Sequence, residues 1–362
     1  MDQAAFEATQ ASYRARLWRW AIWGLFVFQA TVGAGAAEPE GTNEGAGLFA
    51  GLRERISLPA RSLDKVIAWT DQYYFHQWRI QAHVETGECR LLDDNDKLRL
   101  EGSFDDCLAE LKSIKRAENL PPMEGNAVVL LHGLGAPRWS MHLLARYLEK
   151  HGEYATFAID YASLRSNIDD QASSLANVIR SLKGIKQIDL VGHSLGNIVI
   201  RRYLAGNSSA PHVWKPDPRI HRIVMIAPPN HGSLAASRLA GSLVFKTIFG
   251  KSGGQLGESW NNLEERLATP EVEFGIIAGG VGNSIGLNPI LPGDDDGRIT
   301  VETTRLAGAT DFRVVPALHE LIANDPRVFK FTLRFLEKGY FVSRDEATSL
   351  QSTARRPDLP SR

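Results

Sequence analysis

A serine between two glycines, at the junction of an apolar run and a helical pattern, most constrains the fold of this chain. Residues 192–196 are Gly-His-Ser-Leu-Gly; they follow the apolar run 188–191 and precede a helical pattern over 197–204. On such a strand-to-helix turn the hydroxyl of Ser194 projects from the sheet edge, where a base can reach it. The two glycines leave room for a close crossing of strand and helix. The unit predicts an α/β fold.

The rest of the chain from residue 126 alternates apolar and helical patterns. Continuous apolar runs predict buried strands at 127–131, 155–159, 188–191, 220–226, 272–278 and 312–315. Helical patterns cover 140–150, 168–182 and 327–336. Apolar strands that alternate with helices predict a mostly parallel sheet with helices on both faces. We place this domain at 123–342 and expect a disordered tail at 343–362.

An extension precedes the main domain, and Pro121-Pro122 marks the boundary between the two. This extension, 61–122, has mixed structure, with a helical pattern over Leu63–Phe75 and short strand-like pieces at 89–92 and 97–100. Residues 38–60 are rich in Gly, Ala and Glu, which is typical of a flexible linker.

The first 37 residues have the pattern of an export segment. Arg14, Arg16 and Arg19 precede an apolar run over 20–37 that ends in small residues, and acidic residues follow it. This charge order places the N-terminus in the cytoplasm. The run fits a cleaved signal peptide or an uncleaved membrane anchor, with a buried helix of the fold as the third alternative. Both export readings place the main domain outside the cytoplasm, as a periplasmic, secreted or membrane-anchored protein.

The charge and the two cysteines bear on three points: nucleic acid binding, a metal site and a disulfide. The formal net charge is −1, from 41 Lys and Arg against 42 Asp and Glu, so no basic excess favours nucleic acid. Cys89 and Cys107 do not form a Cys-x-x-Cys pair or lie near a histidine cluster, so we expect no metal site. Outside the cytoplasm they could form a disulfide, and a bond or two free thiols both remain open.

Four motifs carry a resemblance to a known family. They are His-Gly-Leu-Gly at 132–135, the glycine-flanked serine at 192–196, Ala-Pro-Pro-Asn-His-Gly-Ser at 227–233, and Asp-Gly at 296–297. With these motifs the chain resembles α/β-hydrolases over residues 125–340, and within that fold bacterial lipases and esterases of the triacylglycerol lipase type. The resemblance implies a serine hydrolase that cleaves carboxylic esters, takes an ester or lipid-like substrate and needs no cofactor.

The resemblance also orders the catalytic residues as serine, acid, histidine. Ser194 would be the nucleophile. Of ten histidines, His319 is the one that follows the acid candidates, and it lies just past a predicted strand, so it would be the base. His231 is its nearest rival, within a turn that resembles a structural turn of lipases. The insertion 230–270 would form a cap or lid, with a packed helix as the alternative.

Three consecutive aspartates offer the acid. Asp296 precedes a glycine and an apolar position, as in the resembling lipases, so it would orient the histidine. Asp294 and Asp295 would then form a solvated turn; a cation shared by the three is only weakly indicated. Asp160 and Glu302 are the next carboxylates to consider.

Two backbone amides would hold the oxyanion. One belongs to Leu195, directly after the nucleophile, and the other to Leu134, in the loop after the first strand of the domain. His132 would pack under that loop in a structural role. The same residues would also serve an acyltransferase or a thioesterase. A non-catalytic scaffold on a hydrolase fold is the third alternative.

Overall fold

The structure is a computed structural model that describes residues 68–209, 211–232, 260–289 and 291–350 of the 362-residue chain. The predictions for the export segment 1–37, for the linker 38–60 and for most of the cap lie outside these residues. No helix in the described ranges has the length and apolar character needed to cross a membrane.

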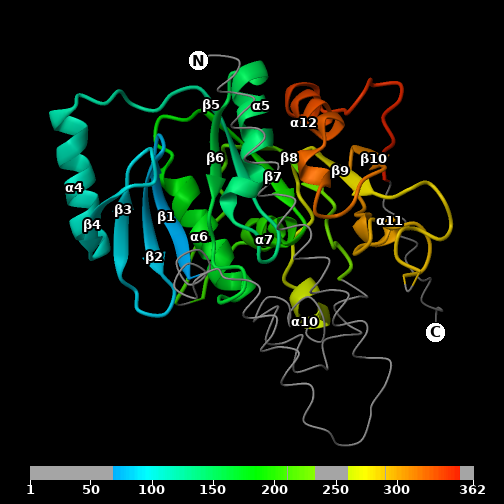
Figure 1. Cartoon of the computed structure of the whole chain (residues 1–362), viewed down its shortest axis with the longest axis horizontal. Helices are drawn as coiled ribbons and strands as arrows, with labels where there is room; N and C mark the ends of the chain where they lie inside the picture. Colours follow the sequence, from blue (N-terminus) through cyan, green and yellow to red (C-terminus); the bar gives the residue numbers. More distant parts are fainter. Residues whose placement is uncertain (1–67, 210, 233–259, 290, 351–362) are drawn as a thin grey trace, which may run out of the picture.

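The described elements divide into an N-terminal extension and a larger α/β unit (Figure 1). The strands are β1 (Trp69–Phe75), β2 (Trp78–His83), β3 (Cys89–Leu92), β4 (Leu98–Gly102), β5 (Asn126–Leu131), β6 (Ala155–Ile159), β7 (Gln187–His193), β8 (Ile220–Ile226), β9 (Phe274–Gly279) and β10 (Asp311–Val315). The helices are α4 (Phe104–Ala117), α5 (His142–Gly152), α6 (Ile168–Ser181), α7 (Leu195–Leu204), α10 (Trp260–Glu264), α11 (Val301–Thr304) and α12 (Pro326–Lys338), with short 3-10 helices η1 (Arg138–Met141) and η2 (Ile322–Asn324).

The larger unit is built on a six-stranded parallel sheet in the order β10-β9-β8-β7-β5-β6. This confirms the predicted α/β fold with a mostly parallel sheet. β7, the strand before Ser194, lies between β5 and β8. The carboxyl ends of parallel strands meet at one edge, so the loops after β5, β7, β9 and β10 lie at the same end of the sheet.

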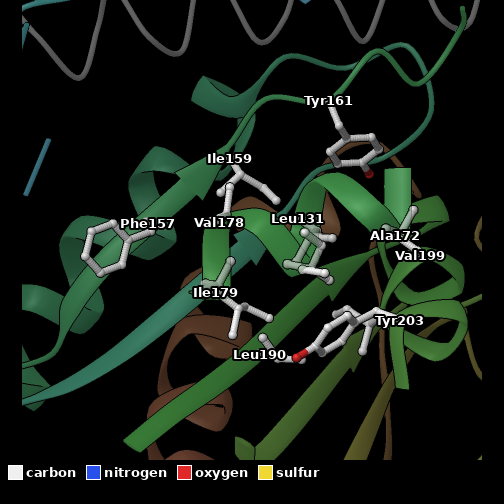
Figure 2. Packing of buried hydrophobic residues seen from close by; sticks show 14 of the residues in the cluster. Leu131, Phe157, Ile159, Tyr161, Ala172, Val178, Ile179, Leu190, Val199 and Tyr203 are labelled. Carbon is white, nitrogen blue, oxygen red and sulfur yellow. The ribbon is translucent and has the colours of Figure 1, made fainter. Parts of the chain in front are cut away.

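Helices cover both faces of this sheet. Successive side chains of a strand point to opposite faces, and in β5 the residues Val128 and Leu130 pack in one apolar cluster with α5 and α12. Val129 and Leu131 pack in the other cluster with α6 and α7 (Figure 2). Because both faces are covered, all four side chains are fully buried. This is why the strand is a continuous apolar run and shows no alternation.

The extension is an antiparallel sheet in the order β1-β2-β3-β4, with α4 packed on β3. The helix predicted over Leu63–Phe75 is therefore wrong where the structure describes it, because Trp69–Phe75 is strand β1. Aromatic side chains favour strands, and here Tyr74 and Phe75 are buried in the core. Pairing with β2 and packing outweigh the helical spacing of the segment.

Strand β1 packs directly on α6. The amide of Tyr74 donates a 2.9 Å hydrogen bond to Oγ of Ser181, and Oγ of Ser174 donates a 2.6 Å hydrogen bond to the carbonyl of Asp71. Both serines are buried by this contact. The extension therefore packs on the larger unit through α6.

The chain after α12 returns to the sheet. The amide of Leu350 donates to the carbonyl of Ala309 at 2.9 Å, and the amide of Gly308 donates to the carbonyl of Leu350 at 2.8 Å. The disordered tail predicted over 343–362 therefore begins too early, since 343–350 is ordered by these contacts. Residues 351–362 lie outside the described ranges.

The two cysteines are buried free thiols. Cys89 lies on β3 and Cys107 in the first turns of α4, within one apolar cluster. Burial raises the pKa of the Cys107 thiol to about 11. A protonated, buried thiol is a poor nucleophile, so these side chains act as apolar packing residues in the structure.

Candidate active site

Ser194 lies on a sharp turn between β7 and α7. Its backbone has φ 52° and ψ −119°, a strained conformation for a residue with a side chain. Close packing requires the two glycines: a Cβ at Gly196 would lie 2.7 Å from the carbonyl oxygen of Leu131, and one at Gly192 would lie 2.3 Å from Oδ1 of Asn197. The close crossing of strand and helix expected from the sequence is present.

Hydrogen bonds hold the strained turn in place. The amide of Ser194 donates to the carbonyl of Ile226 at 2.9 Å, which links the turn to the neighbouring strand β8. The side-chain amide of Asn197 donates to the carbonyls of Ser194 and Ile226, each at 3.1 Å. The serine is therefore fixed by main-chain contacts on both sides.

The structure brings Ser194, His319 and Asp296 together in one hydrogen-bonded chain. The hydroxyl of Ser194 lies 2.9 Å from Nε2 of His319. On the other side of the ring, Nδ1 of His319 lies 2.7 Å from Oδ2 of Asp296. The three residues come from the end of β7, the loop after β10 and the loop after β9. His319 and Asp296 are buried, so their contacts are shielded from water.

The carboxylate of Asp296 has two separate tasks. Its Oδ1 accepts the backbone amides of Arg298 at 3.0 Å and Ile299 at 2.8 Å, while Oδ2 accepts the proton of His319. Its own carbonyl accepts the amide of His319 at 3.0 Å. The tight turn after Asp296 therefore fixes the carboxylate, and the carboxylate in turn fixes both the backbone and the ring of the histidine.

The two preceding aspartates, Asp294 and Asp295, accept hydrogen bonds from backbone amides and do not contact His319. Asp294 accepts the amides of Val281 and Gly282, at 2.7 and 2.9 Å. Asp295 is fully buried and accepts the amides of Asn288 and Gly297, so the expectation of a solvated turn is wrong for this residue. Burial also raises the pKa of the Asp295 carboxyl.

The three carboxylates point to different partners and do not converge. No group of three or more His, Cys, Asp or Glu side chains placed to hold a metal ion is found in the described parts of the chain.

The alternative acid and base residues lie elsewhere. Asp160 forms ion pairs with Arg79 and Arg138. Glu302 is largely exposed and pairs with Arg305, and His231 is exposed and lies 3.2 Å from a carboxylate oxygen of Glu264. Nothing in these contacts connects the three residues to Ser194 or His319. The geometry therefore selects Asp296 and His319 among the sequence candidates.

The loop after β5 packs against the serine. A Cβ at Gly133 would lie 3.3 Å from Cβ of Ser194, so this loop passes directly beside the nucleophile. The next amide along the loop belongs to Leu134. Leu195 is the first residue of α7, where an amide has no acceptor within the helix. The two expected donors, Leu134 and Leu195, thus lie on the two segments that meet at Ser194.

His132 packs against this loop and against Tyr161. Its ring stacks on Tyr161 with 4.1 Å between ring centroids, and its Nδ1 donates to the carbonyl of Gly133 at 2.8 Å. The hydroxyl of Tyr161 donates to the carbonyl of His132, and Oγ of Ser163 accepts the amide of Gly135 at 2.9 Å. Burial lowers the pKa of His132, so this ring is neutral. These contacts agree with the structural role expected for His132.

His193 is a member of the site that the sequence reasoning did not single out. Its Nε2 donates a 2.9 Å hydrogen bond to the carbonyl of His319. The available signal was a polar side chain at the end of a mostly buried strand, directly before the serine. In the sequence His193 stands between Gly192 and Ser194, at a position to which the motif assigns no chemistry.

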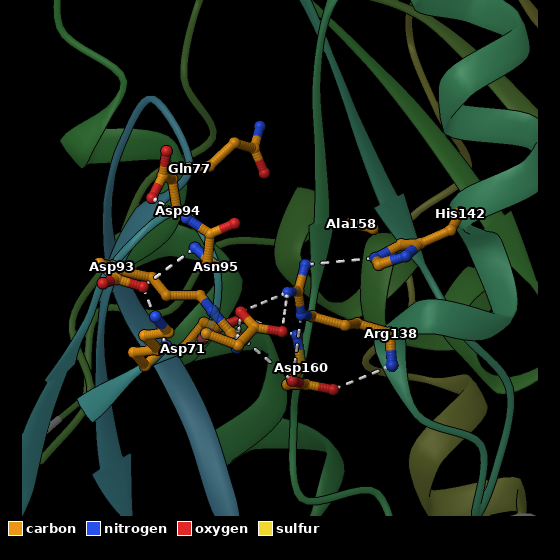
Figure 3. Close-up of polar contacts among 12 residues, drawn as sticks. Asp71, Gln77, Asp93, Asp94, Asn95, Arg138, His142, Ala158 and Asp160 are labelled. Atoms are coloured by element: carbon orange, nitrogen blue, oxygen red, sulfur yellow. Dashed lines mark hydrogen bonds and ion pairs between the residues drawn. The ribbon is translucent and has the colours of Figure 1, made fainter. Parts of the chain in front are cut away.

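A polar network joins the extension to η1 and to the loop after β6 (Figure 3). Arg79 of β2 donates to Asp160 at 3.1 Å and to Asp96 at 2.7 Å. Arg138 of η1 donates its amide to Asp160 at 2.9 Å and its guanidinium to Asp96 at 2.6 Å. Asp71 of β1 accepts the amide of Asp160 at 2.6 Å. The loop after β6 is therefore held by charged groups from both parts of the chain.

A parallel sheet covered on both faces, with a serine on a strained turn after a central strand, defines the class of α/β hydrolases. Sequence comparison agrees with this class. Residues 128–356 match the Alpha/beta hydrolase family, and the chain belongs to that family.

Comparison with curated protein sequences finds no match. Among solved structures, a lipase of Bacillus licheniformis, BlEst2 in its propeptide form, is similar at 19% identity, with 59% of this chain and 51% of that chain covered and a TM-score of 0.44. Phospholipase PlaB of Legionella pneumophila is similar at 19% identity over 49% of this chain and 45% of that chain, with a TM-score of 0.38. An esterase of Thermogutta terrifontis is similar at 14% identity over 60% and 92%, with a TM-score of 0.40. The chain thus spans about half the length of the Bacillus lipase.

Proposed function

We propose that the chain is a serine hydrolase that cleaves carboxylic esters through an acyl-enzyme. The hydrogen-bonded chain from Ser194 through His319 to Asp296 carries this proposal. Oγ of Ser194 attacks the acyl carbonyl while Nε2 of His319 takes its proton. The same nitrogen returns the proton to the leaving alcohol. Asp296 keeps the ring in the required tautomer and stabilises the imidazolium that forms.

The amides of Leu134 and Leu195 support the same reaction. Attack on the carbonyl places negative charge on its oxygen, and preorganised donors stabilise that charge in the transition state. Loss of one such donor typically costs on the order of a hundredfold to a thousandfold in turnover. Water then attacks the acyl-enzyme with His319 as its base, which releases the acid and regenerates Ser194. Each step uses protein groups and water, and no cofactor enters the reaction.

Exposed apolar side chains on the loops that carry His319 and Asp296 support a lipid-like acyl group. Leu318 directly precedes His319, and Leu287 directly precedes Asn288, whose side chain donates to the carbonyl of Gly297 at 3.1 Å. Leu318, Leu287 and Ile285 are between 38% and 67% exposed. Exposed apolar side chains on the loops of a site offer contact area to an apolar ligand. We therefore propose that the acyl chain lies against these side chains.

A chain-length series of nitrophenyl esters tests this substrate class. We expect kcat/KM to rise from acetate to medium-length acyl groups. Leu318→Ser and Leu287→Ser should lower kcat/KM for the longer esters and leave acetate unchanged. Val314→Ser is the matched control, because Val314 is equally exposed but lies on the edge strand β10. Fastest turnover of acetate, with no effect of either leucine substitution, would contradict a lipid-like substrate.

Two further points of the proposal need separate measurements. With an added alcohol, the ratio of free acid to new ester separates hydrolysis from acyl transfer by the same residues, and we expect free acid to dominate.

We also propose export, on the N-terminal charge pattern alone. Expressed in a bacterial host, the protein should appear outside the cytoplasm with its N-terminus near Glu38. A cytoplasmic protein that retains residues 1–37 would refute export.

A further inference from the structure

His193 contacts two of the loops that must meet at the serine. Its backbone directly precedes Ser194, and its Nε2 donates to the carbonyl of His319 at 2.9 Å. The two imidazole rings lie 5.2 Å apart between centroids. On the other side of the ring, a Cβ at Gly133 would lie 3.3 Å from Nδ1 of His193. One side chain therefore lies between the loop that carries His319 and the loop that carries the expected oxyanion donor.

The contact with His319 acts on its backbone, and this separates it from the contacts of Asp296. The carboxylate of Asp296 fixes the rotation of the His319 ring through Nδ1. The carbonyl of Asp296 holds the amide of His319, and His193 holds the carbonyl of the same residue. Both peptide groups that flank the His319 Cα are thereby fixed. The position of the Cα sets the distance of Nε2 from Ser194.

The donor role requires a proton on Nε2 of His193, which the neutral ring can carry. Burial, together with the nearby ring of His319, lowers the pKa of His193 to about 3. The other groups that face it are the carboxylate of Asp296 and the neutral ring of His132. With the proton on Nε2 committed to the His319 carbonyl, His193 stays neutral at ordinary pH and takes no part in proton transfer.

We propose that His193 is a positioning residue, which sets the placement of His319 against Ser194 through its hydrogen bond to the His319 carbonyl. This inference rests on the proposed serine hydrolase function. It assigns a task to the second residue of the glycine-flanked motif. The effect belongs to the chemical step, because the contact lies among protein groups and leaves the substrate untouched.

Glutamine and asparagine at position 193 make a matched test. The amide nitrogen of glutamine lies about as far from the backbone as Nε2 of histidine, so His193→Gln can still donate to the His319 carbonyl. The amide of asparagine is one bond shorter and does not reach. Both variants are polar, uncharged and close in size, so they differ mainly in this hydrogen bond.

The primary readout is the second-order rate constant for labelling of Ser194 by a fluorophosphonate. Ester kinetics, with kcat per labelled site, are measured beside it. We expect His193→Asn to lower both rates about 10- to 100-fold with KM nearly unchanged, since small misplacement of a reacting group has effects of this size. His193→Gln should stay within about threefold of the wild type.

A stability control separates positioning from loss of fold. His221 is also a histidine of the β7–β8 pair, but it contacts Asp189 at the opposite end of these strands. His221→Leu should lower Tm and leave both rates per labelled site unchanged. If His193→Asn has wild-type rates per labelled site, or if His193→Gln is as slow as His193→Asn, the positioning role is refuted. A wild type that labels at Ser194 but hydrolyses no ester refutes the proposed substrate, and the labelling rates still test His193. A wild type that does not label at all refutes both.

Discussion

Asp296→Asn removes one proton acceptor and keeps the shape of the side chain, so it isolates the task of the acid. Oδ1 of Asp296 accepts two backbone amides, from Arg298 and Ile299. An asparagine must keep its oxygen at this position, because an NH2 group there would face two donors. Its NH2 group is then directed at Nδ1 of His319, where Oδ2 now lies at 2.7 Å.

The turn therefore forces the wrong tautomer on the histidine. Facing an NH2 donor, Nδ1 of His319 must be unprotonated, which moves the ring proton to Nε2. A protonated Nε2 cannot take the proton of Ser194, which lies 2.9 Å away. Loss of the correct tautomer costs roughly 10⁴-fold in turnover. This corresponds to about 5.4 kcal/mol of barrier, since each tenfold change is about 1.36 kcal/mol.

The assay is kcat with a nitrophenyl ester, together with the rate of fluorophosphonate labelling and Tm. Asp295→Asn is the control, because Asp295 is an equally buried neighbour whose partners are backbone amides. We expect the control to retain kcat per labelled site within about tenfold, whatever its effect on Tm. If Asp296→Asn keeps kcat within tenfold of the wild type, Asp296 is not the acid and the tautomer argument fails.

Three further predictions follow from other parts of the molecule. Ser194→Ala should abolish labelling and lower hydrolysis on the order of a thousandfold or more with an unchanged circular dichroism spectrum, and activity above about 1% of wild type would reject Ser194 as nucleophile. Gly196→Ala places a Cβ 2.7 Å from the carbonyl oxygen of Leu131 and should destabilise the fold by about 1–3 kcal/mol in chemical denaturation; an unchanged midpoint would contradict the close crossing. Burial and the neighbouring Arg138 lower the pKa of His142 to about 4, so between pH ~6.5 and 4 the unfolded chain binds a proton that the folded protein does not, and stability falls as the pH drops. His142→Gln should flatten this fall in Tm, and an equally steep fall in the variant would refute the assignment.

The fold and the central candidates of the site could be predicted because their signals are local. The turn around Ser194 is defined by five consecutive residues, and the strands of the parallel sheet are continuous apolar runs. His319 could be selected because chain order left one histidine after the acid candidates. The structure brings these residues together, and their catalytic roles remain predictions.

The parts that could not be predicted depend on contacts that form only in the folded structure. From the sequence, Asp295 resembles a residue of a solvated turn. In the structure it is buried and accepts the amide of Asn288. The segment Trp69–Phe75 has helical spacing, and it becomes a strand because β2 pairs with it and α6 packs on it. His193 acquires its partner, His319, from a loop more than a hundred residues further along the chain. For Asp295 and His193 the deciding partner is a backbone amide or carbonyl, and for Trp69–Phe75 it is a neighbouring strand and helix; the sequence reveals the position of none of them.

The family match begins at residue 128, but the structure that holds the site together begins earlier. The amide of Asp71 donates to the carbonyl of Asp160 at 2.9 Å, and its carboxylate accepts the amide of Asp160 in return. The next residue, Tyr161, supports the carbonyl of His132 and so the loop beside the serine. A chain trimmed to the family region would lose these hydrogen bonds and leave the partly buried carboxylate of Asp160 without Arg79. The region that matches the family, residues 128–356, is therefore shorter than the region that must fold for the loop after β5 to keep its shape.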